Sequence, residues 1–154
     1  MSNTKKIKKI IAISSGGGHW IQMLRLRKAF SECDVVYVTV DKGYHKIVAD
    51  SKFYKIIDAN QDTKFSLLIT AINILYIVIK ERADIIISTG AAPGYFGILF
   101  GKIFGAKTIW IDSIANSECL SLSGAKVRKF ADLYLTQWEH LAKEDGPYYS
   151  GSIL

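Results

Sequence analysis

The chain has 154 residues, enough for one domain with a buried core, and no Ser/Gly/Pro-rich stretch or block of charge divides it. Hydrophobic residues make up 49% and the net charge is +6, which favours anionic partners such as phosphorylated ligands or acidic membrane surfaces. No RNA- or DNA-binding motif accompanies this charge, so we expect no nucleic acid partner. Cys33 and Cys119 lack metal-binding spacing, so the sequence suggests neither a zinc site nor a disulfide framework. We expect one domain over residues 1–154.

Four lysines lie near the N-terminus, at positions 5, 6, 8 and 9. They form either a solvated tail or a contact for an acidic surface. They are not followed by a long apolar core or a small-residue cleavage site, as a secretory signal would be. Together with the two isolated cysteines, this predicts a protein of the reducing cytoplasm.

Apolar runs typical of buried strands recur along the chain, with helical patterns between them. Most are near-continuous Val/Ile runs, as expected for a parallel sheet that is covered by helices on both faces. The expected strands are Ile7–Ile13, Val35–Val40, Phe53–Ile57, Ile85–Ile87, Thr108–Ile111 and Leu133–Leu135. This order predicts an α/β, Rossmann-like, doubly wound and mostly parallel sheet. The loops after the first, fourth and fifth strands should then lie side by side and bind the ligand.

The first strand leads into Gly16, Gly17, Gly18 and His19, and a helical pattern follows over residues 21–30. Three glycines let the backbone approach a ligand closely, and the free N–H groups of the next helix favour an anion. His19 adds a group suited to proton transfer near neutral pH. The alternative is a tight strand-to-helix connection without a ligand. Ile21 replaces the small third residue of the dinucleotide fingerprint, which argues against a nicotinamide or flavin cofactor.

Between the third and fourth strands, Phe65–Ile79 is a run of fifteen uncharged residues. As a helix it would be about 22 Å long, short of the roughly 30 Å of a bilayer core. Two interpretations remain open. Either the helix is sandwiched inside the protein, or part of its apolar face meets lipid or a partner.

The fourth strand ends in Ser88, Thr89 and Gly90, small residues that leave room for a bulky polar ligand. Gly97, Gly101 and Gly105 recur every four residues in the following helical pattern, residues 96–104. In a soluble protein this spacing favours close packing of the helix on the sheet over a helix-pairing seam in lipid.

The fifth strand ends in Asp112 and Ser113. A carboxylate at the end of a buried strand either caps the next turn or forms a polar site with His19 from the neighbouring loop. In such a site it could hold the imidazole tautomer or accept a proton itself. No cluster of paired carboxylates is evident, so we expect neither a bound metal nor a cofactor.

Four segments in this order resemble the Alg-fourteen/PssD (CpsF/EpsE type) family of glycosyltransferase subunits over essentially the whole chain. They are GGGHWIQML, STGAAPGYF, WIDSIANSECLSLSG and ADLYLTQWEHL. More remotely, GGGH and the loop after the fourth strand resemble the N-terminal half of MurG, a GT-B enzyme of glycosyltransferase family 28. The resemblance implies a single domain equivalent to that half, which faces the membrane and binds a lipid-linked acceptor.

The resemblance further implies a hexosyltransferase subunit of capsule or exopolysaccharide biosynthesis. It would transfer a sugar from a UDP-sugar to a polyprenyl-pyrophosphate-linked saccharide. Activity would require a heterodimer with a small donor-binding subunit, similar to PssE or Alg-thirteen, with the UDP-sugar shared between the two chains. Attachment to the cytoplasmic face of the cell membrane would be peripheral, through the basic residues and the apolar helix. The alternative is a non-catalytic membrane scaffold that recruits and activates the catalytic partner.

Carried over by position, the resemblance assigns phosphate contact to Gly16, Gly17 and Gly18 and possible proton transfer to His19. Asp112 stands where related sequences commonly have Glu, so its charge is kept with a shorter reach. Either His19 or Asp112 would be the catalytic base. The substrate-binding residues would be Gly16, Gly17, Gly18, Ser88, Thr89, Gly90 and Ser113.

Overall fold

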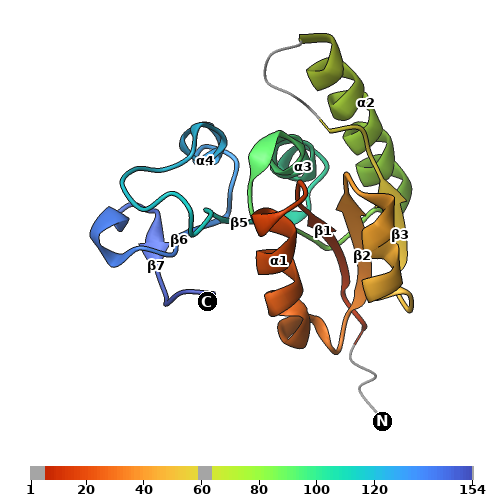
Figure 1. The fold of residues 1–154 in the computed structure, drawn as a ribbon, viewed down its shortest axis with the longest axis horizontal. Helices are drawn as coiled ribbons and strands as arrows, with labels where there is room; N and C mark the ends of the chain where they lie inside the picture. Colours follow the sequence, from red (N-terminus) through yellow and green to blue (C-terminus); the bar gives the residue numbers. More distant parts are fainter. Residues whose placement is uncertain (1–5, 59–63, 154) are drawn as a thin grey trace.

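Seven strands form one sheet over the part of the chain that the structure, a computed structural model, describes: residues 6–58 and 64–153 (Figure 1). The sheet order is β3-β2-β1-β4-β5-β6-β7, and every neighbouring pair is parallel. The strands are β1 Lys9–Ile13, β2 Asp34–Thr39, β3 Lys52–Lys55, β4 Ile85–Ser88, β5 Lys107–Ile111, β6 Leu133–Thr136 and β7 Tyr148–Tyr149. The predicted fold class is confirmed. The two-residue strand β7 was not predicted.

Helices cover both faces of the sheet. They are α1 Gly18–Arg25, α2 Lys64–Glu81, α3 Ala91–Ile103 and α4 Leu122–Val127, with 3-10 helices η1 Leu26–Phe30, η2 Lys42–Val48 and η3 Glu139–Leu141. The helix expected over residues 21–30 starts three residues earlier and ends in the 3-10 turn η1. The helix expected over residues 96–104 starts at Ala91, directly after the fourth strand. Both helices therefore begin inside the loops proposed to bind the ligand.

Alternate residues of β1 enter two separate cores, because successive side chains of a strand point to opposite faces. Ile11 and Ile13 belong to the core that includes residues of α2, α3 and α4. Ile10 and Ala12 belong to the core that includes residues of α1, η1 and η2. β1 is thus buried on both faces, which accounts for its continuous apolar run.

The glycine repeat brings α3 close to the sheet. A Cβ on Gly101 would lie 2.7 Å from the Cδ1 atom of Ile86, and one on Gly97 would collide with Ile13. The expected close packing on strands is confirmed. Larger residues here would push the helix off β1 and β4 and change where its N-terminus lies.

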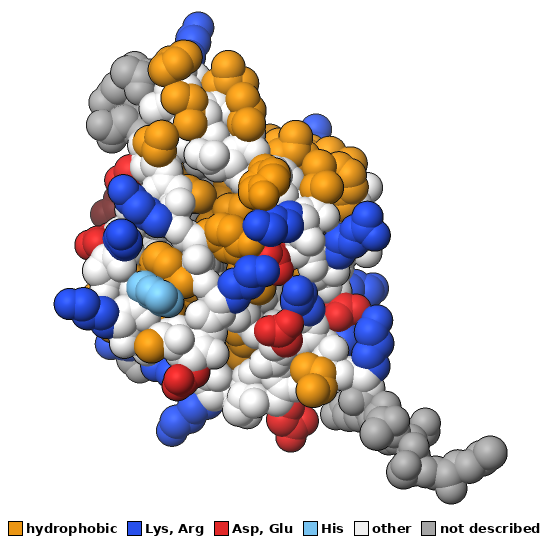
Figure 2. All heavy atoms as spheres, turned by 90° about the vertical axis from the view of Figure 1, so that its right-hand side faces the viewer, with side chains coloured by type: hydrophobic (Ala, Val, Ile, Leu, Met, Phe, Trp, Pro, Cys, Tyr) orange, Lys and Arg blue, Asp and Glu red, His pale blue; other side chains and the backbone are white. Residues whose placement is uncertain are grey.

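α2 exposes most of its apolar face, so the interpretation of a fully sandwiched helix is wrong. The exposed side chains on this face are Phe65, Leu68, Ile72, Tyr76 and Ile79. Figure 2 shows hydrophobic side chains gathered at the upper end of this side of the molecule, with Lys and Arg side chains below them. Thr70 instead points inward and donates to the carbonyl of Ile57 at 3.0 Å. Among the described residues, no helix is long and apolar enough to cross a membrane.

Glu81, at the C-terminal end of α2, is a buried charge that ties the helix to the sheet. Its carboxylate accepts from the Tyr54 hydroxyl at 2.5 Å, from Lys52 at 2.7 Å and from Lys9 at 3.1 Å. Burial by itself would raise the pKa of this carboxyl, but the hydrogen bonds from Lys52, Tyr54 and Lys9 outweigh it and lower the pKa to about 2. Glu81 is therefore ionised in the folded protein at all ordinary pH values.

Candidate functional site at the carboxyl edge of the sheet

Three loops meet at the carboxyl edge of the sheet because β1, β4 and β5 lie next to one another in the sheet. They are residues 14–17 after β1, residues 89–90 after β4 and residues 112–121 after β5. The expectation that these loops are neighbours is confirmed. In open parallel sheets this edge is where ligands bind.

The glycine loop is open toward solvent on one side and braced on the other. A Cβ on Gly17 or Gly18 would meet no atom within 4 Å, whereas one on Gly16 would press on Val40 at 3.2 Å. Gly17 has φ +62° and donates its N–H to the hydroxyl of Tyr44 at 3.1 Å. The Tyr44 ring stacks on Trp20 with 5.0 Å between ring centroids. Tyr44 of η2, which follows β2, thus holds the glycine loop on one side. The backbone of Gly17 and Gly18 remains accessible on the other side.

His19 is tied to the loop after β4. Its Nδ1 atom lies 2.8 Å from the carbonyl oxygen of Thr89, and Thr89 Oγ1 donates to the His19 carbonyl at 2.7 Å. Because a carbonyl oxygen can only accept, Nδ1 carries a proton. In the neutral ring the lone pair then lies on Nε2, for which the described residues supply no hydrogen-bond partner. His19 is only partly buried, so this atom can act as a base toward a ligand.

Two helix N-termini flank His19, and neither is capped by a side chain. The N-caps are Gly17 for α1 and Gly90 for α3, and the first turn of each helix contains no acidic residue. The first N–H groups of a helix have no intrahelical partner, and the helix dipole places positive potential there. Gly90 lies so close to the imidazole that a Cβ on it would be 2.5 Å from the ring. The site therefore offers a base beside two sets of donors for an anion.

Asp112 is buried and fully hydrogen-bonded within its own part of the chain. Oδ1 accepts from the Trp110 indole at 3.1 Å and from the Ser121 hydroxyl at 2.6 Å. Oδ2 accepts from the Asn116 amide at 3.3 Å and from the Ser121 backbone N–H at 3.0 Å. Ser121 is also the N-cap of α4, where its hydroxyl accepts from Gly124. The carboxylate thus orders residues 112–124.

No hydrogen bond or ion pair joins Asp112 to His19, so the expected carboxylate partner of the imidazole is replaced by the carbonyl of Thr89. The structure therefore separates the two predicted catalytic residues into two local networks. His19 has an unoccupied ring nitrogen, whereas all four lone-pair positions of Asp112 are taken. Which of them serves as a base stays a prediction.

The hydroxyls of the predicted substrate-binding residues are used inside the protein. Ser88 accepts from the N–H of Gly90 at 3.1 Å, and Thr89 is bound to His19 as described. Ser113 accepts from the Gln22 amide at 3.1 Å and from the Ala115 N–H at 3.3 Å. These three residues are buried and brace the loops. Of the predicted site residues, Gly17 and Gly18 are exposed and His19 is partly exposed.

Two buried glutamines that no sequence motif singles out connect the loops. Gln22 donates to the Gly18 carbonyl at 3.2 Å and accepts from the Ile114 N–H at 3.2 Å. Gln137 donates to Gln22 at 2.5 Å and to the Asp112 carbonyl at 2.9 Å, and it accepts from the Ile153 N–H at 2.9 Å. A glutamine in an amphipathic helix pattern carries no distinguishing signal. The role of Gln22 becomes visible only in the fold, where α1 places its amide beside the residues that follow β5 and β6.

Within residues 6–58 and 64–153, no group of three His, Cys, Asp or Glu side chains lies close enough together to hold a metal ion. His19 and the helix N-termini beside it support proton acceptance by an imidazole, next to backbone donors that stabilise negative charge.

Comparison with known proteins adds a family and a set of structures with the same fold. A family model described as Oligosaccharide biosynthesis protein Alg14 like matches residues 45–153. No curated protein matches the sequence significantly.

Solved structures share the fold at low sequence identity. MurG from Acinetobacter baumannii is similar with a TM-score of 0.74 and 14% identity, over 94% of this chain and 45% of that one. UDP-N-acetylglucosamine 2-epimerase from Rickettsia bellii is similar with a TM-score of 0.72 and 13% identity, over 96% of this chain and 45% of that one. A glycosyltransferase from Rickettsia africae is similar with a TM-score of 0.60 and 19% identity, over 79% of this chain and 33% of that one. The chain spans less than half the length of each of these structures.

Proposed function

The chain belongs to the Alg14-like family of oligosaccharide biosynthesis proteins, and on that premise we propose that it is the acceptor-binding subunit of a two-component glycosyltransferase. The enzyme transfers a sugar from a UDP-sugar to a saccharide on polyprenyl pyrophosphate, in the synthesis of a capsule or exopolysaccharide. His19 acts as the base, and Gly16, Gly17, Gly18 and Gly90 provide backbone contacts to phosphate. Ser88, Thr89 and Ser113 hold the loops that carry these groups, and Asp112 shapes the loop after β5.

The observation that carries the proposal is the fixed orientation of His19. Its Nδ1–H is held by the Thr89 carbonyl at 2.8 Å, so Nε2 presents a lone pair beside the free N-termini of α1 and α3. A transferase needs a base for the acceptor hydroxyl and donors for phosphate charge. Both requirements are met by residues within two adjacent loops.

In the proposed reaction the acceptor hydroxyl oxygen attacks the anomeric carbon of the UDP-sugar. The bond from that carbon to the β-phosphate oxygen breaks, and UDP leaves with the electron pair. The hydroxyl proton passes to His19 Nε2, and the resulting imidazolium keeps its Nδ1–H bond to the Thr89 carbonyl. Holding one ring nitrogen fixed keeps the other aligned with the reacting oxygen, which lowers the entropy cost of the step.

A second polypeptide supplies the donor-binding half in this proposal. The chain matches the N-terminal half of MurG, and the cleft of such an enzyme has two walls. The exposed carboxyl edge of the sheet provides one wall. A small partner of the kind that the family resemblance implies, similar to PssE or Alg-thirteen, provides the other and shares the UDP-sugar.

The exposed face of α2 supports peripheral attachment to the cytoplasmic face of the cell membrane. Phe65, Leu68 and Ile72 have exposed fractions of 74%, 57% and 57%. An apolar helix face flanked by lysines such as Lys64 and Lys80 suits the boundary between acyl chains and anionic head groups. This arrangement would bring a lipid-linked acceptor to the edge of the sheet that carries His19.

The proposal is tested by co-expressing the chain with a small donor-binding subunit similar to PssE or Alg-thirteen and assaying a panel of UDP-sugars on a polyprenyl-linked acceptor. The pair should transfer sugar, and the isolated chain should not. His19→Ala should lower turnover by about 10²- to 10⁴-fold without affecting assembly of the pair. Full activity of the isolated chain, or of the His19→Ala pair, would overturn it.

A second candidate is a non-catalytic membrane scaffold that recruits and activates its partner. It is favoured by the exposed α2 face and by the complete internal hydrogen bonding of Asp112. Comparing the single variants Ile72→Glu and His19→Ala separates the two candidates. Ile47→Glu on η2 is a matched control for Ile72→Glu, because the two isoleucines have similar exposure. For a scaffold, only Ile72→Glu should reduce activity on phosphatidylglycerol vesicles. For the acceptor-binding subunit, both Ile72→Glu and His19→Ala should.

A further inference from the structure

The loop after β2 is a fourth element at the candidate site. β2 lies next to β1 in the sheet and is parallel to it, so its carboxyl end is at the same edge as the glycine loop. The 3-10 helix η2 begins there, and the Asp41 carboxylate caps it by accepting from the Gly43 N–H at 2.7 Å. This cap places Tyr44 in the first turn of η2, where its backbone N–H donates to the Asp41 carbonyl at 3.3 Å. Tyr44 is thus presented from η2 toward the glycine loop.

Tyr44 contacts the chain on both sides of His19. Its hydroxyl accepts from the Gly17 N–H at 3.1 Å, and its ring stacks on the Trp20 indole with 5.0 Å between centroids and 5° between planes. The residues between these two contacts are Gly18 and His19. One side chain therefore holds the first turn of α1 at its N-cap and again at Trp20.

The two ends of this contact differ in rigidity. Trp20 is buried and also meets the Tyr37 ring edge-on at a centroid distance of 5.7 Å, so it is fixed in the core. Gly17 has φ +62° and no side chain, and glycine leaves such a conformation at little cost. Its carbonyl accepts from the Ile21 N–H at 3.1 Å, while among the described residues its N–H is hydrogen-bonded to Tyr44 alone. Loss of the Tyr44 hydroxyl would therefore loosen the residue at which α1 begins.

Thr89 holds His19 from the opposite side. The Thr89 carbonyl fixes the ring nitrogen Nδ1, and the Thr89 hydroxyl donates to the His19 carbonyl. Neither of these bonds involves Gly17, the residue at which the helix that carries the ring begins. Tyr44 supplies this second constraint from the loop after β2.

Resting on the proposed function, we propose that Tyr44 is a positioning residue for His19. By holding Gly17 and Trp20, it keeps the first turn of α1 in place beside the loop after β4, so that His19 Nε2 stays aligned with the acceptor hydroxyl. Reaction rates depend steeply on such alignment. The loop after β2 thereby contributes to catalysis without touching the reacting atoms.

A direct contact between Tyr44 and the ligand is the alternative that the experiment separates from positioning. The phenol oxygen accepts from Gly17, but the hydroxyl proton has no acceptor in the part of the chain that the structure describes. A ligand contact would act on binding whether or not His19 is present. Positioning acts only through His19.

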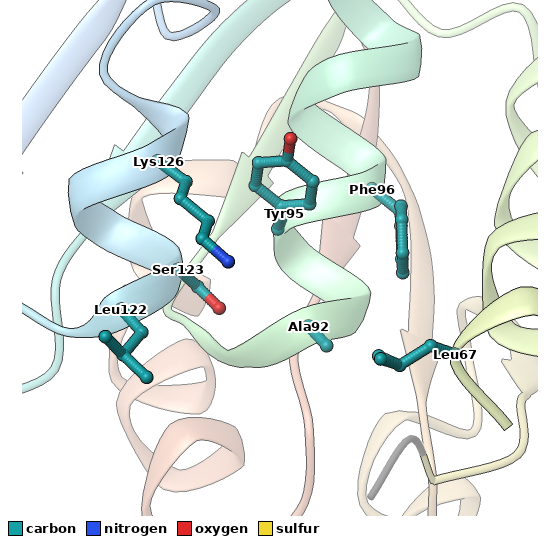
Figure 3. A pocket seen from close by; sticks show the side chains of 7 residues that line it. All are labelled: Leu67, Ala92, Tyr95, Phe96, Leu122, Ser123 and Lys126. Atoms are coloured by element: carbon teal, nitrogen blue, oxygen red, sulfur yellow. The ribbon is translucent and has the colours of Figure 1, made fainter. Parts of the chain in front are cut away.

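A change at Tyr44 leaves the groove on the other face of the sheet intact. This groove of about 300 Å³ lies between α2, α3 and α4, and Figure 3 shows Lys126 and Ser123 projecting from α4 into the space beside Tyr95. Tyr95 packs on the core that includes residues of α2, α3 and α4, whereas Tyr44 packs on the core of the opposite face. Loss of the Tyr44 hydroxyl therefore acts on the glycine loop and not on this groove.

The first test uses Tyr44→Phe in the isolated chain, which keeps the ring on Trp20 and removes only the hydroxyl. The Ile21 N–H should exchange with deuterium roughly five- to tenfold faster than in the wild type, because the Gly17 carbonyl that it bonds is less fixed. The ¹⁵N spectrum of His19 should show a measurable share of the Nε2–H tautomer. Unchanged exchange at Ile21 together with an unchanged His19 spectrum would overturn the proposal.

Tyr37→Phe is the matched control. It removes a hydroxyl from a second tyrosine that contacts Trp20, but the polar neighbour of this hydroxyl is Arg27 rather than the glycine loop. Ile21 exchange and the His19 spectrum should therefore stay at their wild-type values. The same changes in Tyr37→Phe would show a general loosening of the aromatic core, and would overturn a specific role of Tyr44.

The second test measures turnover of the reconstituted pair. Tyr44→Phe should lower kcat by roughly tenfold, and Tyr37→Phe should not. In the His19→Ala background, Tyr44→Phe should cause no further loss of the residual kcat, because a positioning residue acts only through the residue that it positions. Equal fold losses with and without His19, or a raised KM at unchanged kcat, would identify a ligand contact and overturn the proposal.

The positioning role and the proposed function fail separately. Exchange and ¹⁵N spectra are measured without a partner, a sugar donor or an acceptor, so they decide whether Tyr44 orients His19 even when the pair is inactive. An inactive pair would reject the proposed function. An active pair whose kcat is unaffected by Tyr44→Phe would reject the positioning role and retain the transferase.

Discussion

His19 and Thr89 hold each other through two hydrogen bonds of opposite direction. The imidazole donates to the Thr89 carbonyl at 2.8 Å, and the Thr89 hydroxyl donates to the His19 carbonyl at 2.7 Å. Each residue thus uses its side chain to fix the backbone of the other. The relationship locks the loop after β1 to the loop after β4, and it determines which ring nitrogen of the neutral imidazole carries the lone pair.

Thr89→Val should loosen His19 without removing it. The His19 carbonyl loses its donor at a buried position, which should cost about 1 kcal/mol of unfolding free energy. We expect kcat of the reconstituted pair to fall by roughly tenfold with KM nearly unchanged, since the base is misaligned and the ligand contacts remain. Thr89→Ser keeps the hydroxyl and should restore kcat. The ¹⁵N spectrum of His19 should report an Nδ1–H tautomer in the wild type and in Thr89→Ser; a mixed tautomer in the wild type would contradict this geometry.

Gly18→Ala and Gly90→Ala should behave differently although both add one methyl group. The new Cβ at Gly18 meets no atom within 4 Å, so stability should change by less than about 1 kcal/mol. It would, however, occupy the approach to the α1 N-terminus and lower turnover by roughly tenfold.

Gly90→Ala should instead damage both stability and activity. Its φ of +134° is costly for alanine, and the Cβ would lie 2.5 Å from the His19 ring. We expect a loss of about 2 kcal/mol or more in urea unfolding. Normal turnover of Gly18→Ala would show that no ligand approaches the Gly18 backbone.

Asp112→Asn should destabilise the protein. Each carboxylate oxygen of Asp112 accepts two hydrogen bonds, and in asparagine an NH₂ group would replace one of these oxygens and face two donors. Losing charged acceptors at a buried position should cost about 2–3 kcal/mol. Urea unfolding measures this cost, with Asp50→Asn, at an exposed position, as the matched control. An unchanged unfolding free energy combined with lost turnover would instead identify Asp112 as a residue of the chemistry.

Glu81→Gln should change the acid stability of the protein. The pKa of the folded carboxyl is lowered from 4.5 to about 2. The contribution of the ionised Glu81 is therefore present above pH 4.5 and is lost as the pH falls through about 2. Its magnitude is at most about 3 kcal/mol.

The difference in unfolding free energy between wild type and Glu81→Gln should thus shrink steadily between pH 4.5 and pH 2. Glu118→Gln, at an exposed position, should show no such trend. A constant difference across this pH range would mean that the Lys9, Lys52 and Tyr54 contacts do not hold the charge.

Much of the fold could be predicted because its signals are local. Continuous Val/Ile runs such as the one ending at Ile13 are typical of parallel strands buried on both faces. The four-residue spacing of Gly97 and Gly101 indicates a helix that lies close on its sheet, as found. The position of Gly16–Gly18 after the first strand placed the loop at the carboxyl edge. The orientation of α2 could not be predicted, because the few polar residues of this apolar helix do not mark its exposed side: Thr70 is buried, whereas Phe65 is exposed.

The internal partners within the site depend on tertiary placement. Nothing in the sequence indicates that a backbone carbonyl of Thr89, rather than Asp112, holds the imidazole of His19. Gln22 and Gln137 become recognisable only when the fold places α1 beside the end of β6 and so joins two amides that are 115 residues apart. The sequence could therefore identify which loops carry the site, while the tertiary fold determines which of their groups remain free.

The position of β4 beside β1 has a kinetic consequence. The bond between His19 and Thr89 spans 70 residues, so it closes only after β2, β3 and α2 have been made and β4 has inserted next to β1. Contacts of such long range form slowly, because the entropy of closing the intervening chain is lost first. On the ribosome, a nascent chain that ends before β4 contains the whole glycine loop but cannot yet orient the imidazole.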